Sequence, residues 1–381
     1  MIIGIDGTSL LGDRKGVGWY LTHLLEALSH ILEEDKLYVW LNSPSPEERA
    51  RVSENRFVAV SATHYPWAAL RLTWNTLGTP ALESLIGRPA DLYFYPTGMP
   101  IPQKHGKKVL FLHELTCLTQ PEMADPEEFQ TFVPELQKQI AKADLVLTCS
   151  EYNRRELIKH FSGLTEAKVR VVPYGVPESF LKPASTAQVQ NLRSQYGLNK
   201  PYFLFTGRLE PRKNLLRLVH SFLLFTQRVK TDHQLVLAGP RGWIGEDFIQ
   251  FILAPQVVER VRWIDSVASP DLPALYSGAD AFFLPSVRES FGLPALEAMG
   301  CGTPVICSNT GALSEVVGDA AWLVDPTKVP DWSLAMQRIV TEPEFGRLLR
   351  EKGRTRVGLF KMENSAKQTL AAFRLAVQTH G

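Results

Sequence analysis

Short apolar runs alternate with longer amphipathic stretches along most of the 381-residue chain. In the first half the runs predict strands at 2–5, 37–41, 57–60, 92–95, 109–112, 145–148 and 169–172. Helical spacing of apolar residues lies between them, most clearly at 18–32, 126–141 and 152–161. Strands and helices in this alternation predict a parallel sheet that is covered on both faces.

The alternation fails between 173 and 201, where prolines and glycines are dense, as is typical of a domain connection, with one short helix expected at 188–196. It then resumes, with strands expected at 202–206, 234–238, 261–264, 281–284, 305–307 and 321–324 and helices at 214–229 and 248–258. The tail from 330 to 380 is predicted to be helical, with breaks near Pro343 and Gly353. The pattern therefore predicts two doubly wound α/β domains in tandem, over 1–180 and 181–360, followed by a helix over 361–381.

Charge and cysteine usage narrow the classes of partner and location. The chain has 41 basic and 40 acidic residues, whereas a nucleic-acid-binding domain usually has a basic excess, so no nucleic-acid partner is expected. The four cysteines form no C-x-x-C pair, which favours free thiols in a reducing compartment. The first six residues are too short and uncharged for a signal peptide, and no apolar run approaches the ~18 residues of a membrane span. We expect a cytoplasmic protein that can still contact the inner membrane face.

The segment 288–305, RESFGLPALEAMGCGTPV, lies between two expected strands. Pro294 suits the start of a helix, so the loop before it should present backbone N–H groups to an anion. Glu289 stands in this loop at the carboxyl end of a strand, where open α/β sheets bind ligands, and Glu297 follows one turn into the helix. Two carboxylates there predict hydrogen bonds from sugar and ribose hydroxyls. The alternative makes Glu289 a charge partner of the helix N-terminus and Glu297 a solvated residue.

A second segment, 207–214 (GRLEPRKN), follows the strand expected at 202–206. Its Arg208 and Lys213 stand where a pyrophosphate would lie, because a planar fork and a point charge suit that group. The alternative is a basic turn with Arg212 and Lys213 in solvent.

Two further positions lie in the first domain. Gly16, in the segment 13–20 (DRKGVGWY), would let the backbone approach a ligand closely. It is not part of a dinucleotide fingerprint, because Leu21 stands where a third glycine belongs. His113 follows the strand expected at 109–112, where it either reaches the cleft or is a satisfied interior histidine.

Together these segments resemble the retaining glycosyltransferases of family four, which have the two-domain GT-B fold. Residues 289–297 match the E-x7-E motif of that family, with the internal F-G-L-P and the following G-x-P-V. Residues 207–214 match its phosphate motif, and 16–18 match its N-terminal glycine loop. His113-Glu114 matches a motif that is more often His-Asp, and 172–176 (VPYGV) matches the family's junction, which usually has Asn in place of Tyr174.

The resemblance implies a deep cleft between two Rossmann-like domains that close over a nucleotide-sugar donor, with the helix over 361–381 packing back on the first domain. The implied catalytic residues are His113, Glu289, Arg208 and Lys213. The implied donor-binding residues are Gly16, Gly207, Arg208, Lys213, Glu289, Phe291, Gly292, Leu293 and Glu297.

The resemblance also implies a role for each residue. Glu289 would contact hydroxyls of the transferred sugar, Glu297 would bind the ribose, and the N–H groups of 291–293 would hold sugar and phosphate. Arg208 and Lys213 would neutralise the diphosphate leaving group. Gly16 would let the first domain close on the diphosphate, and His113 would lie beside the sugar. Retention would proceed by attack on the same face of the sugar, without a protein nucleophile.

No D-x-D triplet occurs in the chain, so neither a metal ion nor a cofactor is expected. The N-terminal and His113 segments look most like bacterial polysaccharide enzymes that use GDP-mannose, which favours mannose transfer to a saccharide, lipid-linked or small-molecule acceptor. The apolar segment 65–74 (YPWAALRLTW) could contact a membrane or a lipid-linked acceptor, or form a core helix.

Several alternatives remain open. They are a UDP-sugar donor, an epimerase or phosphorylase on the same fold, and a non-catalytic protein that binds sugar nucleotides. A nicotinamide-dependent oxidoreductase is disfavoured, because no G-x-G-x-x-G follows a strand.

Overall fold

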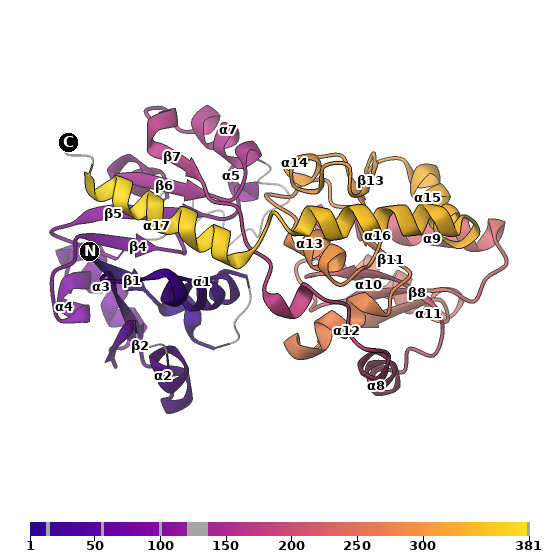
Figure 1. Cartoon of the computed structure of the whole chain (residues 1–381), viewed down its shortest axis with the longest axis horizontal. Coiled ribbons are helices and arrows are strands. Elements are labelled where there is room, and N and C mark those ends of the chain that lie inside the picture. The colour runs from indigo at the N-terminus through magenta and orange to yellow at the C-terminus, as the bar shows by residue number, and fades with distance from the viewer. Residues whose placement is uncertain (13–15, 55–56, 99–100, 120–135, 379–381) are drawn as a thin grey trace. The chain divides into compact units, whose positions relative to one another are not determined.

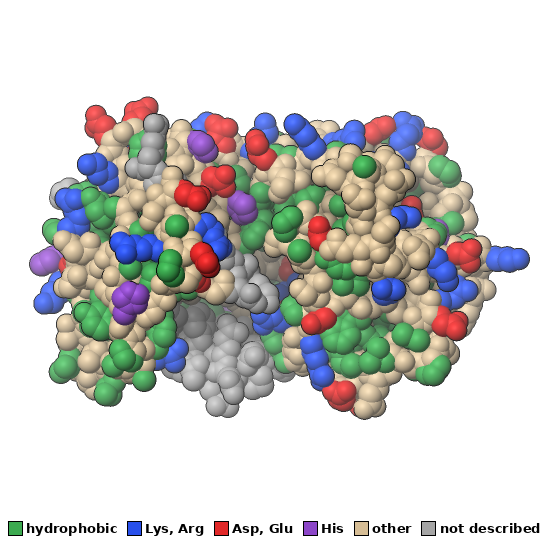
Figure 2. Space-filling view, turned by 90° about the horizontal axis from the view of Figure 1, so that it is seen from below, with side chains coloured by type: hydrophobic (Ala, Val, Ile, Leu, Met, Phe, Trp, Pro, Cys, Tyr) green, Lys and Arg blue, Asp and Glu red, His purple; other side chains and the backbone are tan. Residues whose placement is uncertain are grey.

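The computed structural model describes residues 1–12, 16–54, 57–98, 101–119 and 136–378 (Figure 1). The chain divides into two compact units. Unit 1 comprises Met1–Gly175 and Met362–Gly381, and unit 2 comprises Val176–Lys361. Acidic and basic side chains are interspersed over the face drawn in Figure 2, in keeping with the net charge of +1.

Unit 1 is built on a seven-stranded parallel sheet in the order β3-β2-β1-β4-β5-β6-β7. The strands are β1 (Ile2–Asp6), β2 (Lys36–Asn42), β3 (Val58–Thr63), β4 (Leu92–Tyr95), β5 (Lys107–Leu112), β6 (Leu145–Thr148) and β7 (Val169–Val171). All seven expected strands are confirmed. Every residue of β4 and β6 is buried, because helices cover both faces of the sheet and leave no polar side to a central strand.

The helices of unit 1 include α1 (Val17–Ile31), α2 (Pro46–Ser53), α3 (Trp67–Leu77), α4 (Leu82–Ile86), α5 (Thr116–Thr119), α7 (Glu151–His160) and α17 (Met362–Gln378). The helix expected at 126–141 lies partly outside the described residues, which are helical from 136 to 142. Helix α17 packs against α1, β4 and β5 (Figure 1). Its Phe373 is fully buried, 5.1 Å from the ring of Phe94.

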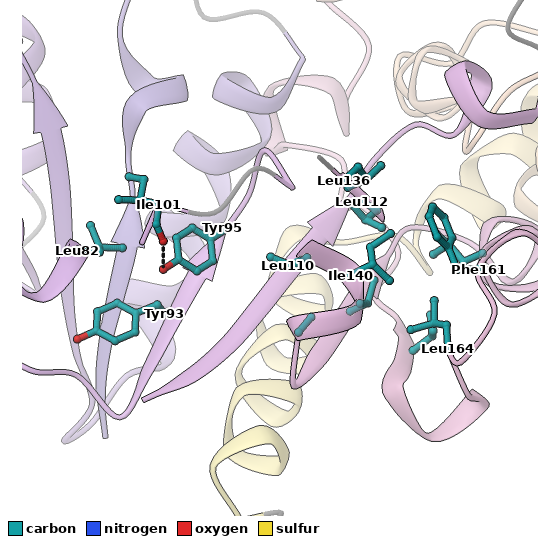
Figure 3. Packing of buried hydrophobic residues seen from close by; sticks show 14 of the residues in the cluster. Leu82, Tyr93, Tyr95, Ile101, Leu110, Leu112, Leu136, Ile140, Phe161 and Leu164 are labelled. Atoms are coloured by element: carbon teal, nitrogen blue, oxygen red, sulfur yellow. Dashed lines mark hydrogen bonds between the residues drawn. The ribbon is translucent and has the colours of Figure 1, made fainter. Parts of the chain in front are cut away.

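One core of unit 1 lies between the sheet and the helices that cover it (Figure 3). The cluster includes Tyr95 and Leu110 from the strands, together with Ile140 and Phe161. The phenol of Tyr95 would be costly to bury without a partner, and its hydroxyl donates to the carbonyl oxygen of Ile101 at 3.1 Å.

Residues 67–74 of the apolar segment 65–74 lie in α3, and the interpretation of the segment as a core helix is wrong for most of its length. Leu70 is buried and Trp74 is half-buried, but Trp67 and Leu72 are exposed, Leu72 by 64%. Helix α3 packs on the sheet of unit 1 through Trp74, whose ring lies 6.2 Å from that of Trp40 in β2. Among the described residues, no helix has both the length and the apolar character needed to cross a membrane.

Unit 2 contains a six-stranded parallel sheet in the order β10-β9-β8-β11-β12-β13. The strands are β8 (Tyr202–Thr206), β9 (Gln234–Ala238), β10 (Val261–Ile264), β11 (Ala281–Leu284), β12 (Val305–Ser308) and β13 (Trp322–Val324). All six match the expected positions. The central strands β8 and β11 are wholly buried, as their unbroken apolar sequences predict.

The helices of unit 2 are α8 (Thr186–Tyr196), α9 (Leu215–Arg228), α10 (Glu246–Leu253), α11 (Pro255–Val258), α12 (Leu272–Ser277), α13 (Leu293–Gly300), α14 (Leu313–Val317), α15 (Val329–Thr341) and α16 (Pro343–Val357). The single helix expected at 248–258 is divided, because Pro255 starts a new helix after the extended Ala254.

The predicted break at Pro343 is confirmed, whereas the break predicted near Gly353 is wrong. Helix α16 continues to Val357, and the non-helical segment lies between α16 and α17. Gly353 instead lies where α16 packs on α13, because a Cβ there would lie 3.1 Å from Cγ of Met299 in α13. The missing side chain lets the two helices approach closely.

The chain passes between the units twice, at Gly175–Val176 and at Lys361–Met362. A Cβ on Gly175 would lie 2.3 Å from Cα of Met362, so only glycine allows the two segments to meet there. On the unit 2 side of the crossings, the N–H of Val176 donates to the carbonyl oxygen of Phe360 at 2.7 Å. The two crossings therefore run beside each other.

Candidate functional site

Three loops of unit 2 follow neighbouring strands of its sheet. They come after β8 (207–214), β11 (285–292) and β12 (309–312). Parallel strands end at one edge, so these loops meet there, and this is the edge at which open α/β sheets bind ligands. The E-x7-E and phosphate segments thus lie in adjacent loops.

Glu289 and Lys213 form the centre of this site. The ammonium group of Lys213 lies 2.6 Å from Oε1 of Glu289, and Ser286 donates to the same oxygen at 2.6 Å. Nη1 of Arg212 lies 3.1 Å from the other oxygen, Oε2. Burial would raise the pKa of Glu289, but the cations of Lys213 and Arg212 and the hydroxyl of Ser286 outweigh it and lower the pKa to about 2. The carboxyl group is therefore ionised at neutral pH.

Arg212 also contacts a second carboxylate. Its Nε lies 2.6 Å from Oε1 of Glu210, which is buried. Because Lys213 is buried and Arg212 is 15% exposed, the alternative of a basic turn in solvent is wrong. Glu210 and Arg212 were not predicted as members of the site, although both stand in the segment 207–214.

The local turn explains why these side chains point inward. Pro211 opens the short 3-10 helix η5 (Pro211–Lys213), and Asn214 follows it with a left-handed backbone, φ 57°. Nδ2 of Asn214 donates to the carbonyl oxygen of Pro285 at 3.0 Å, and the N–H of Val287 donates to that of Arg212 at 2.9 Å. These bonds join the loop after β8 to the loop after β11.

The loop after β12 supports Glu289 from its backbone side. The N–H of Ala312 donates to the carbonyl oxygen of Glu289 at 2.9 Å. A Cβ on Gly311, whose φ is +62°, would lie 2.5 Å from that oxygen. The loop can therefore approach Glu289 only because residue 311 has no side chain.

Phe291, Gly292 and Leu293 lie at the N-terminus of α13, as the sequence predicts. Gly292 is the N-cap with φ +97°, Leu293 begins the helix and Pro294 stands in its first turn. Phe291 is buried, 5.8 Å from the ring of Phe360. A helix N-terminus with glycine at its cap suits an anion, since its first N–H groups have no partner within the helix.

Glu297 is buried within α13, which excludes the alternative of a solvated residue. Its Oε2 accepts a hydrogen bond from the hydroxyl of Tyr276 at 2.8 Å. Burial raises the pKa of Glu297 to about 7, although the bond from Tyr276 acts in the opposite direction.

Arg208 follows Gly207 and is exposed. Its guanidinium carbon lies 6.0 Å from the ring centroid of Trp243. A Cβ on Gly242 would lie 2.8 Å from the side chain of Arg208, and one on Gly239 would lie 2.2 Å from the carbonyl oxygen of Gly207. The loop after β9 therefore packs closely on Arg208, a contact that the hydrophobic pattern does not indicate.

His113 belongs to unit 1 and has both ring nitrogens in hydrogen bonds. Nε2 lies 2.6 Å from the carbonyl oxygen of Pro96, and Nδ1 lies 2.6 Å from the hydroxyl of Tyr174. Burial lowers the pKa of His113 to about 4, so the ring is neutral at pH 7. Since a carbonyl can only accept, Nε2 carries the hydrogen and Nδ1 accepts from Tyr174. This is the environment of a satisfied interior histidine, and a role beside the sugar stays a prediction.

Gly16 is the N-cap of α1 with φ 54°, and a Cβ there would meet no atom of the described residues within 4 Å. Its predicted neighbours at 13–15 lie outside the described residues. The open space at Gly16 leaves room for a close approach, and its role at a diphosphate stays a prediction.

Comparison with known proteins gives the family. The model of "Glycosyl transferases group 1" matches residues 188–356, which include all three loops of the unit 2 site. The O-antigen chain mannosyltransferase B of Escherichia coli is 31% identical over 292 residues, which cover 75% of this chain and 74% of that protein. The chain belongs to the group 1 glycosyltransferases.

Solved structures agree with this assignment at the level of fold. Sucrose-phosphate synthase of Thermosynechococcus elongatus superposes with a TM-score of 0.76 at 22% identity and covers 98% of both chains. The Anabaena protein HepE, solved in complex with UDP-glucose, superposes with a TM-score of 0.72 at 19% identity, over 97% of this glycosyltransferase and 99% of HepE. The predicted GT-B fold with two doubly wound domains is confirmed.

Proposed function

We propose that this glycosyltransferase moves mannose from GDP-mannose to a saccharide or lipid-linked acceptor, with retention of configuration and without a metal ion. The observation that carries the proposal is the buried cluster of Glu289 with Lys213 and Arg212, at the carboxyl ends of β8 and β11. The Escherichia coli O-antigen mannosyltransferase supports mannose as the transferred sugar.

The cations of the cluster suit the leaving group. Departure of the sugar develops negative charge on the diphosphate, which fixed cations in a water-poor site stabilise. A lysine ammonium has three donors, and its contact with Glu289 uses one of them. Lys213 could thus bind the diphosphate without leaving Glu289, while Arg208 would reach it from the exposed side of the loop.

Glu289 fits the role of sugar contact better than that of nucleophile. A carboxylate held ionised can accept strong hydrogen bonds from sugar hydroxyls. The same two cations that keep it ionised also withdraw charge from both of its oxygens, which weakens it as an attacking group. This supports same-face attack by the acceptor, and we assign no protein nucleophile.

The first test is thermal stabilisation by GDP, UDP, ADP and their sugar conjugates. A ligand that binds only the folded protein at 100 times its Kd adds about 2.7 kcal/mol to the free energy of unfolding. We expect a shift with GDP and GDP-mannose. A shift with UDP and UDP-glucose alone would support a UDP-sugar donor, which the likeness to HepE favours. No shift with any nucleotide would contradict the donor site.

Transfer itself is tested with GDP-mannose and a panel of saccharide acceptors. Turnover that requires an acceptor, with a product of the donor's anomeric configuration by NMR, is the expected result. Turnover without an acceptor would indicate an epimerase. Binding without turnover across the panel would favour the non-catalytic alternative.

Independence from metal has its own test. Treatment with EDTA should leave the rate of transfer within about twofold, because side-chain cations would neutralise the diphosphate in place of a divalent ion. Loss of activity with EDTA and its return with Mg²⁺ or Mn²⁺ would contradict this part of the proposal.

A further inference from the structure

Tyr276 is a buried tyrosine that stands outside the two segments selected from the sequence. It lies in α12 and is 1% exposed. Its ring packs between Phe180 and Phe282, with centroids 6.0 and 5.4 Å away. Those contacts fix the ring, and therefore the direction of its hydroxyl.

The hydroxyl of Tyr276 connects two parts of the site. It donates to Oε2 of Glu297 at 2.8 Å, and Oγ1 of Thr206 lies 2.6 Å from it. A phenol has one hydrogen, so when Tyr276 donates to Glu297 the donor to Tyr276 is Thr206. Thr206 is the last residue of β8, directly before Gly207 and Arg208. A chain of buried hydrogen bonds thus runs from the phosphate loop to the second glutamate of the E-x7-E motif.

The two oxygens of Glu297 differ as a result. Oε2 is held by Tyr276, and no other side chain in the described part of the protein donates to this carboxyl group. Oε1 is therefore the oxygen left to accept from a ligand, and its position depends on how firmly Oε2 is held.

We propose that Tyr276 is a positioning residue for nucleotide recognition, whose hydroxyl fixes Oε2 of Glu297 so that Oε1 faces the ribose hydroxyls of the donor. The inference rests on the proposed function, because it takes the ribose as the ligand of Glu297. It adds a residue that acts on the nucleotide through Glu297 without touching it.

The test compares each nucleotide with its analogue that lacks both ribose hydroxyls. Isothermal titration calorimetry would give Kd for GDP and 2′,3′-dideoxy-GDP, and for the corresponding uridine pair, with the full-length protein and Tyr276→Phe. The wild type should prefer the ribonucleotide by roughly ten- to hundred-fold, the size of a hydrogen bond to a charged group. Tyr276→Phe should reduce that preference by about tenfold and leave the Kd of the dideoxy nucleotide unchanged.

Tyr202→Phe is the matched control. The hydroxyl of Tyr202 is also buried in unit 2 and donates to the carbonyl oxygen of Leu275 at 2.7 Å, outside the chain that ends at Glu297. Both variants lose one buried hydrogen bond and should melt at a lower temperature, but Tyr202→Phe should keep the full preference for the ribonucleotide. If Tyr276→Phe fails to fold, Thr206→Val should show a smaller loss of preference in the same direction.

The outcomes separate the inference from the function on which it rests. A wild type that binds no nucleotide, or binds the dideoxy form equally well, would overturn the ribose role of Glu297 and with it the inference. A wild type with the expected preference, fully retained in Tyr276→Phe or in Thr206→Val, would overturn the inference alone.

Discussion

At the scale of single residues, Glu289 and Glu297 show how neighbours decide the state of a buried carboxyl group. Both are buried in unit 2, and burial alone would raise the pKa of each. Lys213 and Arg212 reverse the effect at Glu289 and bring its pKa to about 2. In the described part of the chain, the hydroxyl of Tyr276 is the one side-chain donor to Glu297, and the pKa of Glu297 stays raised at about 7. The two carboxyl groups of the E-x7-E motif therefore differ in charge: at pH 7 Glu289 is ionised, whereas Glu297 is partly protonated.

Replacement of Lys213 by alanine should lower kcat by about two to three orders of magnitude, the effect of losing one charge stabiliser of a transition state. The measurement is the steady-state rate of sugar transfer with saturating donor. Lys352→Ala is the control, since Lys352 pairs with Asp319 on the surface of unit 2, and its turnover should not change. Wild-type turnover in Lys213→Ala would remove Lys213 from the site.

The raised pKa of Glu297 predicts a pH dependence of nucleotide binding. Below pH 7 the carboxyl group is increasingly protonated in the free protein, and ribose hydroxyls bind the ionised form better. Affinity for GDP should therefore rise as pH increases from 5 to about 7 and then level off. Glu289, with its pKa of about 2, stays ionised over this range and adds nothing to the slope.

The check is Kd for GDP from pH 5 to 8 in the wild type and in Glu297→Gln. A terminal phosphate also titrates near pH 6, so the informative quantity is the difference between the two profiles. The variant should bind GDP more weakly at pH 8 and lose the part of the slope that Glu297 supplies. Identical profiles would contradict the role of Glu297.

At the scale of elements, the site depends on loops that support one another. The loop after β12 holds the backbone of Glu289, and the loop after β9 packs on Arg208. Close approach is possible at each place because a glycine stands there, Gly311 in the first case and Gly242 in the second.

Gly311→Ala should lower kcat by about tenfold to a hundredfold. The added Cβ would lie 2.5 Å from the carbonyl oxygen of Glu289, so one of the two loops must move, and a displacement of about 1 Å at a reacting centre can cost that much. Gly163→Ala is the matched control, because Gly163 has φ +88° but open space around its Cβ position. Gly163→Ala should lose about 1–2 kcal/mol in the free energy of unfolding from its backbone conformation alone, Gly311→Ala should lose more because of the added clash, and only Gly311→Ala should lose activity. Equal kinetics in the two would contradict the loop contact.

The sequence predicted the strands more completely than it predicted the contacts between side chains. All thirteen described strands were predicted, most clearly where a strand is buried on both faces and forms an unbroken apolar run, such as Ala281–Leu284. The positions of Glu289 and Lys213 followed from the rule that ligands bind at the carboxyl edge of a parallel sheet. The ion pairs of Glu289 with Lys213 and Arg212 could not be predicted, because the turn that brings the loops together has the left-handed backbone of Asn214.

The roles of Tyr276, Thr206 and Gly353 were also not predicted, because they depend on neighbours that are distant in the sequence. Tyr276 and Thr206 look like core residues in the sequence, since nothing in the hydrophobic pattern distinguishes a buried hydroxyl that holds a carboxylate. Gly353 reads as a helix breaker, but close packing on Met299 keeps it within α16.

At the scale of the whole molecule, unit 1 is discontinuous in sequence, because α17 joins it only after the chain has passed through unit 2. Phe373 of α17 is fully buried against β4 and β5 of unit 1. Phe373→Ala should lower the stability of unit 1 by about 3–5 kcal/mol, the usual cost of removing a buried phenylalanine ring.

Hydrogen exchange measured by mass spectrometry would check this prediction by region. Peptides from β4 and β5 should lose protection in Phe373→Ala, whereas peptides from β8 and α9 should not. Leu334→Ala, at a 48% exposed position of α15, is the control and should leave both units unchanged. Loss of protection confined to unit 2 would contradict the assignment of α17 to unit 1.

The late position of α17 has a consequence for synthesis on the ribosome. A nascent chain makes the strands of unit 1 first, then all of Val176–Lys361, and only afterwards the helix that covers part of the first sheet. At ~5–20 residues per second, the delay is roughly 10 to 40 s. During that time unit 2 can fold completely, while the surface of α1, β4 and β5 that α17 will cover is open to chaperones or to other nascent chains.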